Sequence, residues 1–310
     1  MTGKGQHRLT LRVLAAGVAV AVAGAGLAQV RIITTSPQLE DPLAGPQIVD
    51  PLTGKPGMTT MSVLQASDDP KFGDDQYRPY SGQAGKDVVW VPTPDSLVVA
   101  MLESAGVTRD DYVVDLGSGD GRIAIAAARQ FGARAHGIEY NPKMVSLARR
   151  EAQRVGVANR VTFAQADIFK SDFSDATVVT MYLLPSLNLR LRDTILNMRP
   201  GTRVVSHAFD MGDWEPDRTI RTDDASGYLW IVPANIAGRW AFEIGNDRFA
   251  ADLVQQYQKL SMPRATPFRD GRIRGTTVSL TRSNGQVLEG EVRGDTIVGR
   301  GWTATRIAQN

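Results

Sequence analysis

The segment from Val113 to Arg122 contains the residues best suited to chemistry. It reads VVDLGSGDGR, an apolar run that ends in an acid and passes through three glycines toward a predicted helix. Glycine lacks a Cβ and adopts positive φ freely, so the backbone can pass directly beneath a ligand. The helix presents free N–H groups to a ligand carboxylate, and Asp115 can accept a hydrogen bond from an ammonium group. We therefore predict a site for a nucleotide-like ligand carrying an amino acid, formed by Asp115, Gly117, Ser118, Gly119 and Asp120.

Two other interpretations of this loop are weaker. A dinucleotide-binding loop has the spacing G-x-G-x-x-G and holds a pyrophosphate at the helix N-terminus, whereas this loop has G-x-G-x-G. Asp115 and Asp120 would repel a pyrophosphate but attract an ammonium group. A turn without a ligand would not explain three glycines and two acids in so few residues. The loop thus favours S-adenosylmethionine (SAM) over NAD.

Two more acids follow the next two predicted strands. Glu139 ends the second strand, where a carboxylate can accept hydrogen bonds from both ribose hydroxyls. Asp167 follows the third strand and could accept the adenine amino group while Ile168 packs on the ring. We also include Tyr140, next to Glu139, in the predicted cofactor site. Each acid alone could be an ordinary surface charge, but Asp115, Glu139 and Asp167 occur in order at successive strand ends.

Residues 90–207 resemble a class I SAM-dependent methyltransferase. More narrowly, the sequences VPTP at residues 91–94, DLGSGDGR at 115–122 and EYNP at 139–142 resemble a protein-lysine methyltransferase family. Animal members of that family modify mitochondrial proteins, including the ATP synthase c-subunit. The chain also resembles bacterial proteins of unassigned substrate that share the loop. The resemblance, which covers less than half the chain, implies SAM as cofactor and lysine as acceptor.

The fourth strand ends in TMYLLP, residues 180–185. In this fold that turn faces the transferable methyl group. DNA and glutamine methyltransferases carry Asn/Asp-Pro-Pro-Tyr there, so its absence disfavours planar nitrogen acceptors. We predict that Tyr182 and Pro185, with Leu184, line the acceptor channel; a packed aromatic at a strand end is the alternative for Tyr182. His207 ends the fifth strand and is more readily explained as structural than as a proton acceptor.

The elements around these residues alternate between strand and helix. Helices are predicted at residues 96–106, 121–131, 142–155 and 186–198, and strands at 112–116, 135–139, 161–165, 176–181 and 202–207. Strands joined through helices imply crossover units, so we expect a Rossmann-like, doubly wound α/β domain over residues 87–236 with a mostly parallel sheet. A hairpin at residues 219–222 and 228–232, with Ser226-Gly227 between its strands, is expected to close it. The loop after His207, with Asp210, Asp213 and Trp214, could cover the pocket.

Residues 237–310 change in character. Short strands with turn signals such as Asn284-Gly285 and Gly294-Asp295 predict a small β-rich module. Strands are expected near residues 238–244, 274–280, 287–292 and 296–299. One helix is predicted at about Ala250 to Leu260.

The N-terminal residues 1–35 predict a targeting segment. Basic residues precede an uncharged Ala/Gly/Val-rich run over residues 13–30, of borderline length for a membrane span. Gly26-Leu27-Ala28 provides a small-x-small cleavage pattern, so a cleaved signal peptide and a retained anchor are both open. The positive charge before the segment predicts export or membrane association through residues 13–30, with the following residues outside the cytoplasm. SAM, however, is made and used in the cytoplasm, so the side of the membrane stays open. Residues 36–86 are rich in Pro and polar residues and are expected to form a disordered linker.

Composition narrows the function further. Lys and Arg (35) nearly balance Asp and Glu (33), so no charge excess indicates nucleic acid as a partner. The chain has no cysteine and three scattered histidines, and no metal site is indicated. We therefore predict methyl transfer from SAM to an acceptor, a protein lysine or a small molecule. A non-catalytic SAM-binding sensor or scaffold is the alternative from another class.

Overall fold

The computed structural model describes residues 47–49, 56–59, 72–263 and 266–308. The first two segments, β1 (Gln47–Val49) and β2 (Pro56–Thr59), pair as a small antiparallel sheet in a unit of their own. The described residues from 72 onward belong to one compact unit. The predicted targeting segment lies outside the described residues, and within them no helix is long and apolar enough to cross a membrane.

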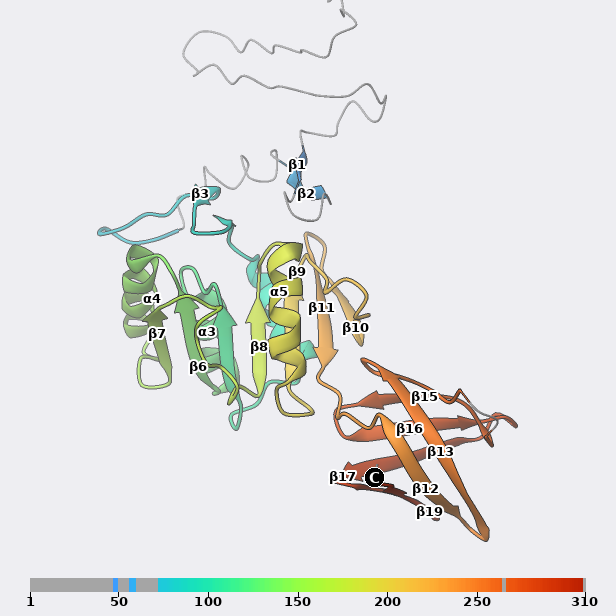
Figure 1. Ribbon diagram of the computed structural model, residues 1–310. Helices are drawn as coiled ribbons and strands as arrows, with labels where there is room; N and C mark the ends of the chain where they lie inside the picture. The colour runs from blue at the N-terminus through green and yellow to red at the C-terminus, as the bar shows by residue number, and fades with distance from the viewer. Residues whose placement is uncertain (1–46, 50–55, 60–71, 264–265, 309–310) are drawn as a thin grey trace, which may run out of the picture. The chain divides into compact units, whose positions relative to one another are not determined.

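A seven-stranded mixed sheet forms the part of the larger unit that precedes the C-terminal barrel in the chain (Figure 1). Its strand order is β10-β11-β9-β8-β5-β6-β7. Five neighbouring strands are parallel, and the hairpin of β10 and β11 adds antiparallel strands at the β9 edge. The strands are β5 (Tyr112–Leu116), β6 (Arg134–Glu139), β7 (Val161–Gln165), β8 (Val178–Met181), β9 (Arg203–His207), β10 (Arg218–Arg221) and β11 (Ser226–Ile231). The predicted Rossmann-like fold is confirmed. The turn of the hairpin, however, lies at Thr222 to Ala225, and Ser226-Gly227 already belongs to β11.

Helices cover both faces of this sheet. One apolar cluster joins it to α2, α3 and α4, and a second joins its other face to α5 (Figure 1). Their bounds are α2 (Asp95–Ser104), α3 (Arg122–Phe131), α4 (Pro142–Arg154) and α5 (Pro185–Leu196). Because β5 and β8 are buried on both faces, their sequences are largely apolar, as expected for central parallel strands, with Asp115 and Thr180 as the polar exceptions.

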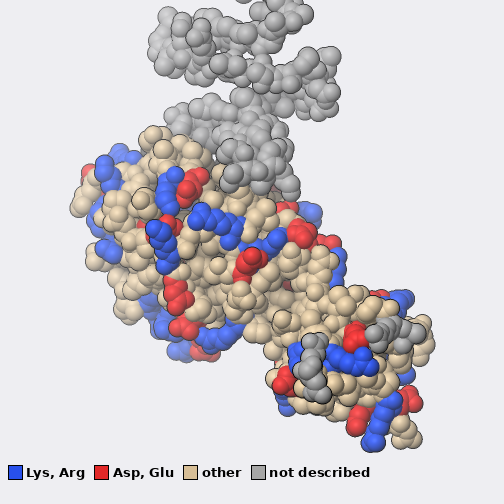
Figure 2. All heavy atoms as spheres, in the orientation of Figure 1, with Lys and Arg blue, Asp and Glu red and all other residues tan. Residues whose placement is uncertain are grey.

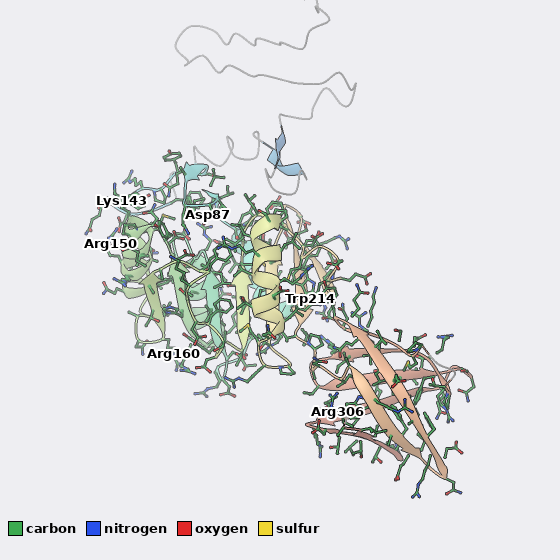
Figure 3. The ribbon with its side chains drawn as sticks, viewed as in Figure 1. Asp87, Lys143, Arg150, Arg160, Trp214 and Arg306 are labelled. Carbon is green, nitrogen blue, oxygen red and sulfur yellow. The ribbon has the colours of Figure 1, made fainter. Side chains whose placement is uncertain are left out.

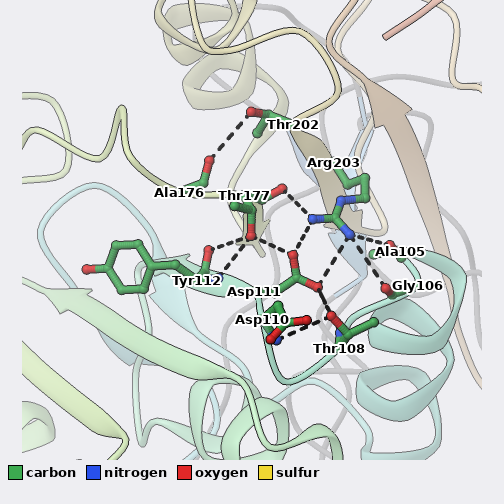
Figure 4. A network of polar contacts seen from close by, with 10 residues as sticks. All are labelled: Ala105, Gly106, Thr108, Asp110, Asp111, Tyr112, Ala176, Thr177, Thr202 and Arg203. Atoms are coloured by element: carbon green, nitrogen blue, oxygen red, sulfur yellow. Dashed lines mark hydrogen bonds and ion pairs between the residues drawn. The ribbon is translucent and has the colours of Figure 1, made fainter. Parts of the chain in front are cut away.

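The amino ends of the central strands are joined by a buried ion pair (Figure 4). Arg203, at the start of β9, donates to Asp111 and to the Thr177 carbonyl, and the Thr177 hydroxyl donates to Asp111 at 2.7 Å. Burial alone would raise the Asp111 pKa, but the hydrogen bonds from Arg203 and Thr177 outweigh it and lower the pKa. This network fixes the edge opposite the predicted site, whose residues lie at the carboxyl ends of the strands.

The C-terminal module is a closed antiparallel barrel of eight strands, in which β19 pairs back with β12. Aromatic side chains fill its interior, among them Trp240, Phe242 and Trp302. The strands are β12 (Gly238–Ile244), β13 (Asp247–Gln256), β14 (Lys259–Ser261), β15 (Phe268–Arg274), β16 (Thr277–Arg282), β17 (Val287–Arg293), β18 (Thr296–Gly299) and β19 (Trp302–Arg306). The predicted β-rich module is confirmed.

Two details of that prediction were wrong. The helix predicted from Ala250 to Leu260 is instead most of β13 and the start of β14. Ala251 and Leu253 are buried at a spacing of two, and β13 pairs first with β12 and then with β14, so tertiary pairing overrides the helix-forming composition. The strand predicted at residues 274–280 is interrupted by a turn at Gly275, whose φ is +60°.

Charged side chains of both signs are interspersed on the face shown in Figure 2. No large patch of one sign is visible on that face, in keeping with the balanced composition of the chain.

Candidate functional site

The glycine loop connects β5 to α3 in a backbone conformation that requires glycine. Gly117, Gly119 and Gly121 have φ of 75°, 53° and 83°. A Cβ on Gly121 would lie 2.6 Å from the Phe163 ring, and one on Gly119 would lie 2.4 Å from Nε1 of Trp90. The glycines therefore provide both positive φ and close approach of other groups to the backbone.

Asp115 is a buried carboxylate at the end of β5, with only 2% of its surface exposed. The Thr180 hydroxyl, from β8, donates a 2.6 Å hydrogen bond to Asp115 Oδ1. Burial raises the pKa of Asp115 to about 7, and the negative charges of Asp120 and Glu139 add to that rise. The site therefore carries surplus negative potential, which a bound cation would relieve.

Glu139 lies beside the glycine loop at the end of β6. Its Oε2 accepts from the Gly119 N–H at 2.9 Å, and its Oε1 accepts from the Asn141 N–H at 2.8 Å. A carboxylate oxygen can accept two hydrogen bonds, so Glu139 retains capacity for two ligand hydroxyls. The predicted proximity of Asp115, Glu139 and the loop is present.

The other two polar residues of the loop face different partners. Asp120 pairs with Arg122, Oδ2 to Nη2 at 2.6 Å, and Arg122 also donates to the Thr93 carbonyl. Ser118 Oγ is buried without a hydrogen-bond partner within the described part of the chain. A role for Asp120 and Ser118 in cofactor binding stays a prediction.

Asp167 is engaged by a residue that the sequence pattern did not indicate. Lys86 Nζ lies 2.9 Å from Asp167 Oδ2, and the Phe169 N–H donates to Oδ1 at 3.0 Å. The hydrogen bond from Lys86 lowers the pKa of Asp167, so the carboxylate is ionised at neutral pH. Lys86 Nζ also lies 5.1 Å from the centre of the exposed Tyr140 ring, whereas Ile168 packs against the apolar cluster under α5.

A pocket of about 380 Å³ opens beside these groups. It is lined by residues of the segment before α2 and of the two loops after β6 and β7: Ala84, Gly85, Lys86, Tyr140, Asn141, Pro142, Gln165 and Ala166. The lining includes Tyr140 and the Asp167 partner Lys86, but neither Asp167 nor Ile168, so the predicted adenine contacts of those two residues stay a prediction.

Residues 72–90 form an N-terminal strap along the cofactor edge, although residues 36–86 were expected to be a disordered linker. Asp74 pairs with Arg150 of α4 (Figure 3), at 2.5 Å between Oδ2 and Nε. Gln83 is buried and donates to Met144 Sδ. Trp90 lies on Gly119. The strap consequently contributes Trp90 and Lys86 to the site, and neither residue belongs to a local sequence motif that would have indicated it.

The predicted acceptor turn is aromatic and without net charge. The Tyr182 ring lies 3.7 Å from the His207 ring and 6.2 Å from that of Phe209, centre to centre. Burial lowers the pKa of His207 to about 4 and raises the pKa of Tyr182 well above its ordinary value, so both are neutral at pH 7. Thr93 Oγ1 lies 3.1 Å from His207 Nδ1. Pro185 is buried as the first residue of α5.

The loop after β9, which the sequence suggested as a cover for the pocket, is held against α5 by its own side chains. Trp214 is fully buried in the core under α5, Asp213 pairs with Arg192 of α5 at 2.5 Å, and Asp210 accepts from the Gly212 N–H.

Known methyltransferases are similar to the part of the chain that forms this site. The family model of the ANTKMT methyltransferase domain matches residues 115–218. A protein-lysine N-methyltransferase of Saccharolobus islandicus is 41% identical over 151 residues, which are 47% of this chain and 94% of that protein. The chain belongs to this family of SAM-dependent methyltransferases.

Two further lysine methyltransferases are similar over a shorter share of their length, and one solved methyltransferase is similar over nearly all of its length. The adenine nucleotide translocase lysine N-methyltransferase of Mus musculus is 43% identical, covering 42% of this chain and 56% of the mouse protein. The Xenopus laevis lysine N-methyltransferase that is named for the ATP synthase c-subunit is 32% identical, covering 52% and 65%. A solved RNA methyltransferase of Salinibacter ruber with S-adenosyl-L-homocysteine is 53% identical, with TM-score 0.46, covering 47% and 96%.

The residues present fit the SAM of a class I methyltransferase. The buried carboxylate of Asp115 accepts a hydrogen bond from the neutral hydroxyl of Thr180 and suits an ammonium group. Glu139 would hold the ribose, and the pocket beside Tyr140 would hold the adenine. SAM supplies an activated methyl group on a sulfonium; the protein's own task is to orient the reactants and exclude water.

We expect Lys86→Met to tighten binding of S-adenosylhomocysteine by about two- to fivefold, the range of a partly exposed ion pair. In the structure Lys86 occupies the Asp167 carboxylate, so its removal frees that acceptor for the ligand. Titration calorimetry at low and high salt measures the effect, which should shrink as salt screens the pair.

Lys143→Met is the matched control for this change, because Lys143 is exposed on α4 and lies over Tyr77 instead (Figure 3). Equal affinities for the two variants, or weaker binding for Lys86→Met, would show that Lys86 does not compete at Asp167.

Proposed function

We propose that this chain transfers a methyl group from SAM to a lysine amine of a protein. The observation that carries the proposal is the neutral aromatic turn at Tyr182, set at the same sheet edge as the cation-seeking carboxylate of Asp115. The names of the relatives from Saccharolobus, Xenopus and Mus, which are lysine methyltransferases, support the same acceptor.

The chemistry of the acceptor explains why such a turn is useful. A lysine amine has an ordinary pKa near ~10.4 and must lose its proton before it can attack a methyl carbon. An apolar wall and a nearby sulfonium both disfavour the ammonium form. Because burial keeps His207 neutral, the turn at Tyr182 would present no imidazolium charge to the sulfonium of bound SAM.

Transfer from SAM with a tritiated methyl group, in a protein extract of the host cells, tests the proposal. We expect label in the protein fraction, released by acid hydrolysis as methylated lysine, and none when Asp115→Asn replaces the natural chain. Label confined to small molecules would indicate a small-molecule methyltransferase. Label in neither fraction would favour a SAM-binding sensor or scaffold, and both outcomes contradict lysine transfer.

We also propose that residues 13–30 direct the protein to a membrane, as a signal peptide or an anchor. The support is the uncharged run preceded by basic residues. A C-terminal reporter active only outside the cytoplasm tests export, and a reporter active only inside would contradict it.

A further inference from the structure

The ten residues after β9, from Ala208 to Asp217, form what we call the acceptor loop. Its second residue, Phe209, stacks on Tyr182 with ring centres 6.2 Å apart and planes 29° apart. Its first residue, Ala208, has φ of 62°, in the left-handed region. A non-glycine residue keeps that conformation only where the surroundings impose it, so other contacts must hold the loop.

Helix α5 provides one set of these contacts. The buried Asn188 Nδ2 donates to the carbonyls of Phe209 and Asp210 at 3.2 and 3.1 Å. Arg192 Nη1, one turn further along, donates to the Met211 carbonyl at 3.0 Å and to Asp213 at 2.5 Å. These bonds fix the side of the loop that faces the helix.

The barrel provides a second set through the turn between β13 and β14. The Tyr257 hydroxyl donates to Asp213 Oδ2 at 3.0 Å, and its ring stacks on Trp214 with centres 6.0 Å apart and planes 20° apart. The Arg192 guanidinium lies 5.4 Å from the same ring. Tyr257 therefore contacts the acceptor loop and its α5 anchor together.

Neighbouring residues of the turn, of β14 and of β15 extend this contact. Gln258 is buried and donates to the Glu215 carbonyl at 2.7 Å, and Lys259 pairs with the Glu215 carboxylate at 2.6 Å. Arg272 pairs with Asp217 at 2.9 Å. The barrel thus holds the loop from Asp213 to Asp217, where it leads back into the sheet.

Tyr257 itself adopts a conformation that its position must impose. Its φ is 53°, and among the described non-glycine residues only Ala208 and Tyr257 have positive φ. These two residues lie at opposite ends of the contacts that link the acceptor loop to the barrel. Asparagine and glycine occupy such positions at lower steric cost than tyrosine. The contacts of the tyrosine side chain therefore explain why this residue occupies a strained backbone position.

We propose that the C-terminal barrel positions the acceptor side of the methyl-transfer site, and that Tyr257 is the positioning residue through which it acts. The inference rests on the proposed function, because Phe209 and Tyr182 are taken to line the acceptor channel. The effect of the barrel passes to them through Asp213, Trp214 and the course of the acceptor loop. Cofactor binding depends on β5, β6 and the strap, and is therefore independent of Tyr257.

The test compares three variants of the full chain. Tyr257→Gly removes the ring while relieving the positive-φ strain, so a loss of function cannot be ascribed to added backbone strain. Tyr257→Phe keeps the ring and removes the hydrogen bond to Asp213. Arg248→Ala alters an exposed barrel residue paired with Glu243 and is the control.

Three quantities are measured on each variant: affinity for S-adenosylhomocysteine, amide hydrogen exchange of residues 208–214, and the rate of tritium transfer against extract concentration at saturating SAM. For Tyr257→Gly we expect affinity within about twofold of the natural chain, exchange about tenfold faster, and maximal transfer about tenfold slower, because small displacements of a reacting site have such costs. Tyr257→Phe should retain most of the rate, and Arg248→Ala should change nothing.

Unchanged exchange in Tyr257→Gly would overturn the inference, even if the natural chain transferred no label. The inference would also be overturned if hydrogen exchange became faster while the methyl-transfer rate stayed unchanged. A transfer rate that fell only in proportion to the affinity for the cofactor would overturn it as well. Absence of transfer by the natural chain, by contrast, would contradict the proposed function, and hydrogen exchange would still decide whether Tyr257 holds the loop.

Discussion

Asp115→Asn should stabilise the protein at pH 8 and at the same time abolish its affinity for SAM. Burial raises the pKa of Asp115 from 3.8 to about 7, so its ionisation opposes folding. The destabilisation is absent below the unfolded pKa, grows between about pH 4 and 7, and is constant above pH 7. Asparagine removes this cost, and we expect a gain of about 1–3 kcal/mol after allowance for its imperfectly bonded amide.

The loss of SAM affinity should reach at least ~100-fold, because removing one member of a buried charge pair leaves the other without a partner. In the natural chain, affinity should rise with pH up to about 7 and then level off as Asp115 ionises. The variant should lack this dependence. Thermal unfolding and titration calorimetry between pH 5 and 8 measure both effects.

Asp111→Asn is the control with the opposite sign. Asp111 is also buried, but Arg203 and Thr177 lower its pKa, so its ionised form stabilises the fold. That variant should be less stable at pH 8, and the difference should diminish as the pH falls through the folded pKa. If Asp115→Asn destabilised the protein at pH 8 as much as Asp111→Asn does, ionisation of Asp115 would not oppose folding, and this prediction would be wrong.

Gly119→Ala should weaken binding of S-adenosylhomocysteine by about tenfold or more, while the fold survives. The new Cβ would lie 2.4 Å from Trp90 Nε1, so the indole must move off the loop or the loop must move under the ligand. Positive φ adds roughly 1–2 kcal/mol for an L-residue. Calorimetry gives the affinity, and circular dichroism gives the stability.

Gly106→Ala separates the effect of backbone strain from the effect of the close contact with Trp90. Gly106 has φ of 61°, close to that of Gly119, but nothing lies within 4 Å of its virtual Cβ. It should show the same loss of stability from backbone strain and unchanged affinity. Comparable affinities for both alanine variants would mean that the close approach at Gly119 does not matter for binding.

The parts of the site that were predictable are those specified by contiguous residues. A strand that is buried on both faces of a sheet has a largely apolar sequence. That apolar run, followed directly by the glycine loop, was enough to predict the path of the backbone and the position of Asp115. The order of Glu139 and Asp167 follows from the same rule, because parallel strands bring their carboxyl ends to one edge.

The parts that could not be predicted depend on contacts between distant residues. Lys86 meets Asp167 across 81 positions of sequence, from the end of a segment whose composition indicated a linker. Trp90, four residues further along, contacts Gly119 although the two are far apart in sequence. Tyr257 lies where the sequence predicted a helix, because β13 pairs with β12 before this turn and with β14 around it, and no local pattern records those pairings. Trp214 was open to interpretation as a cover, since its burial under α5 depends on residues far from it in sequence.

Titration of SAM into the full chain at pH 8 tests the central claim most directly, because every proposal for this site requires the cofactor to bind. We expect one site per chain with a dissociation constant of about 1–100 μM, corresponding to roughly 5–8 kcal/mol, and no measurable binding to Asp115→Asn. Absence of binding by the natural chain at millimolar SAM would contradict the assignment of the glycine loop, Glu139 and the Tyr140 pocket as a SAM site.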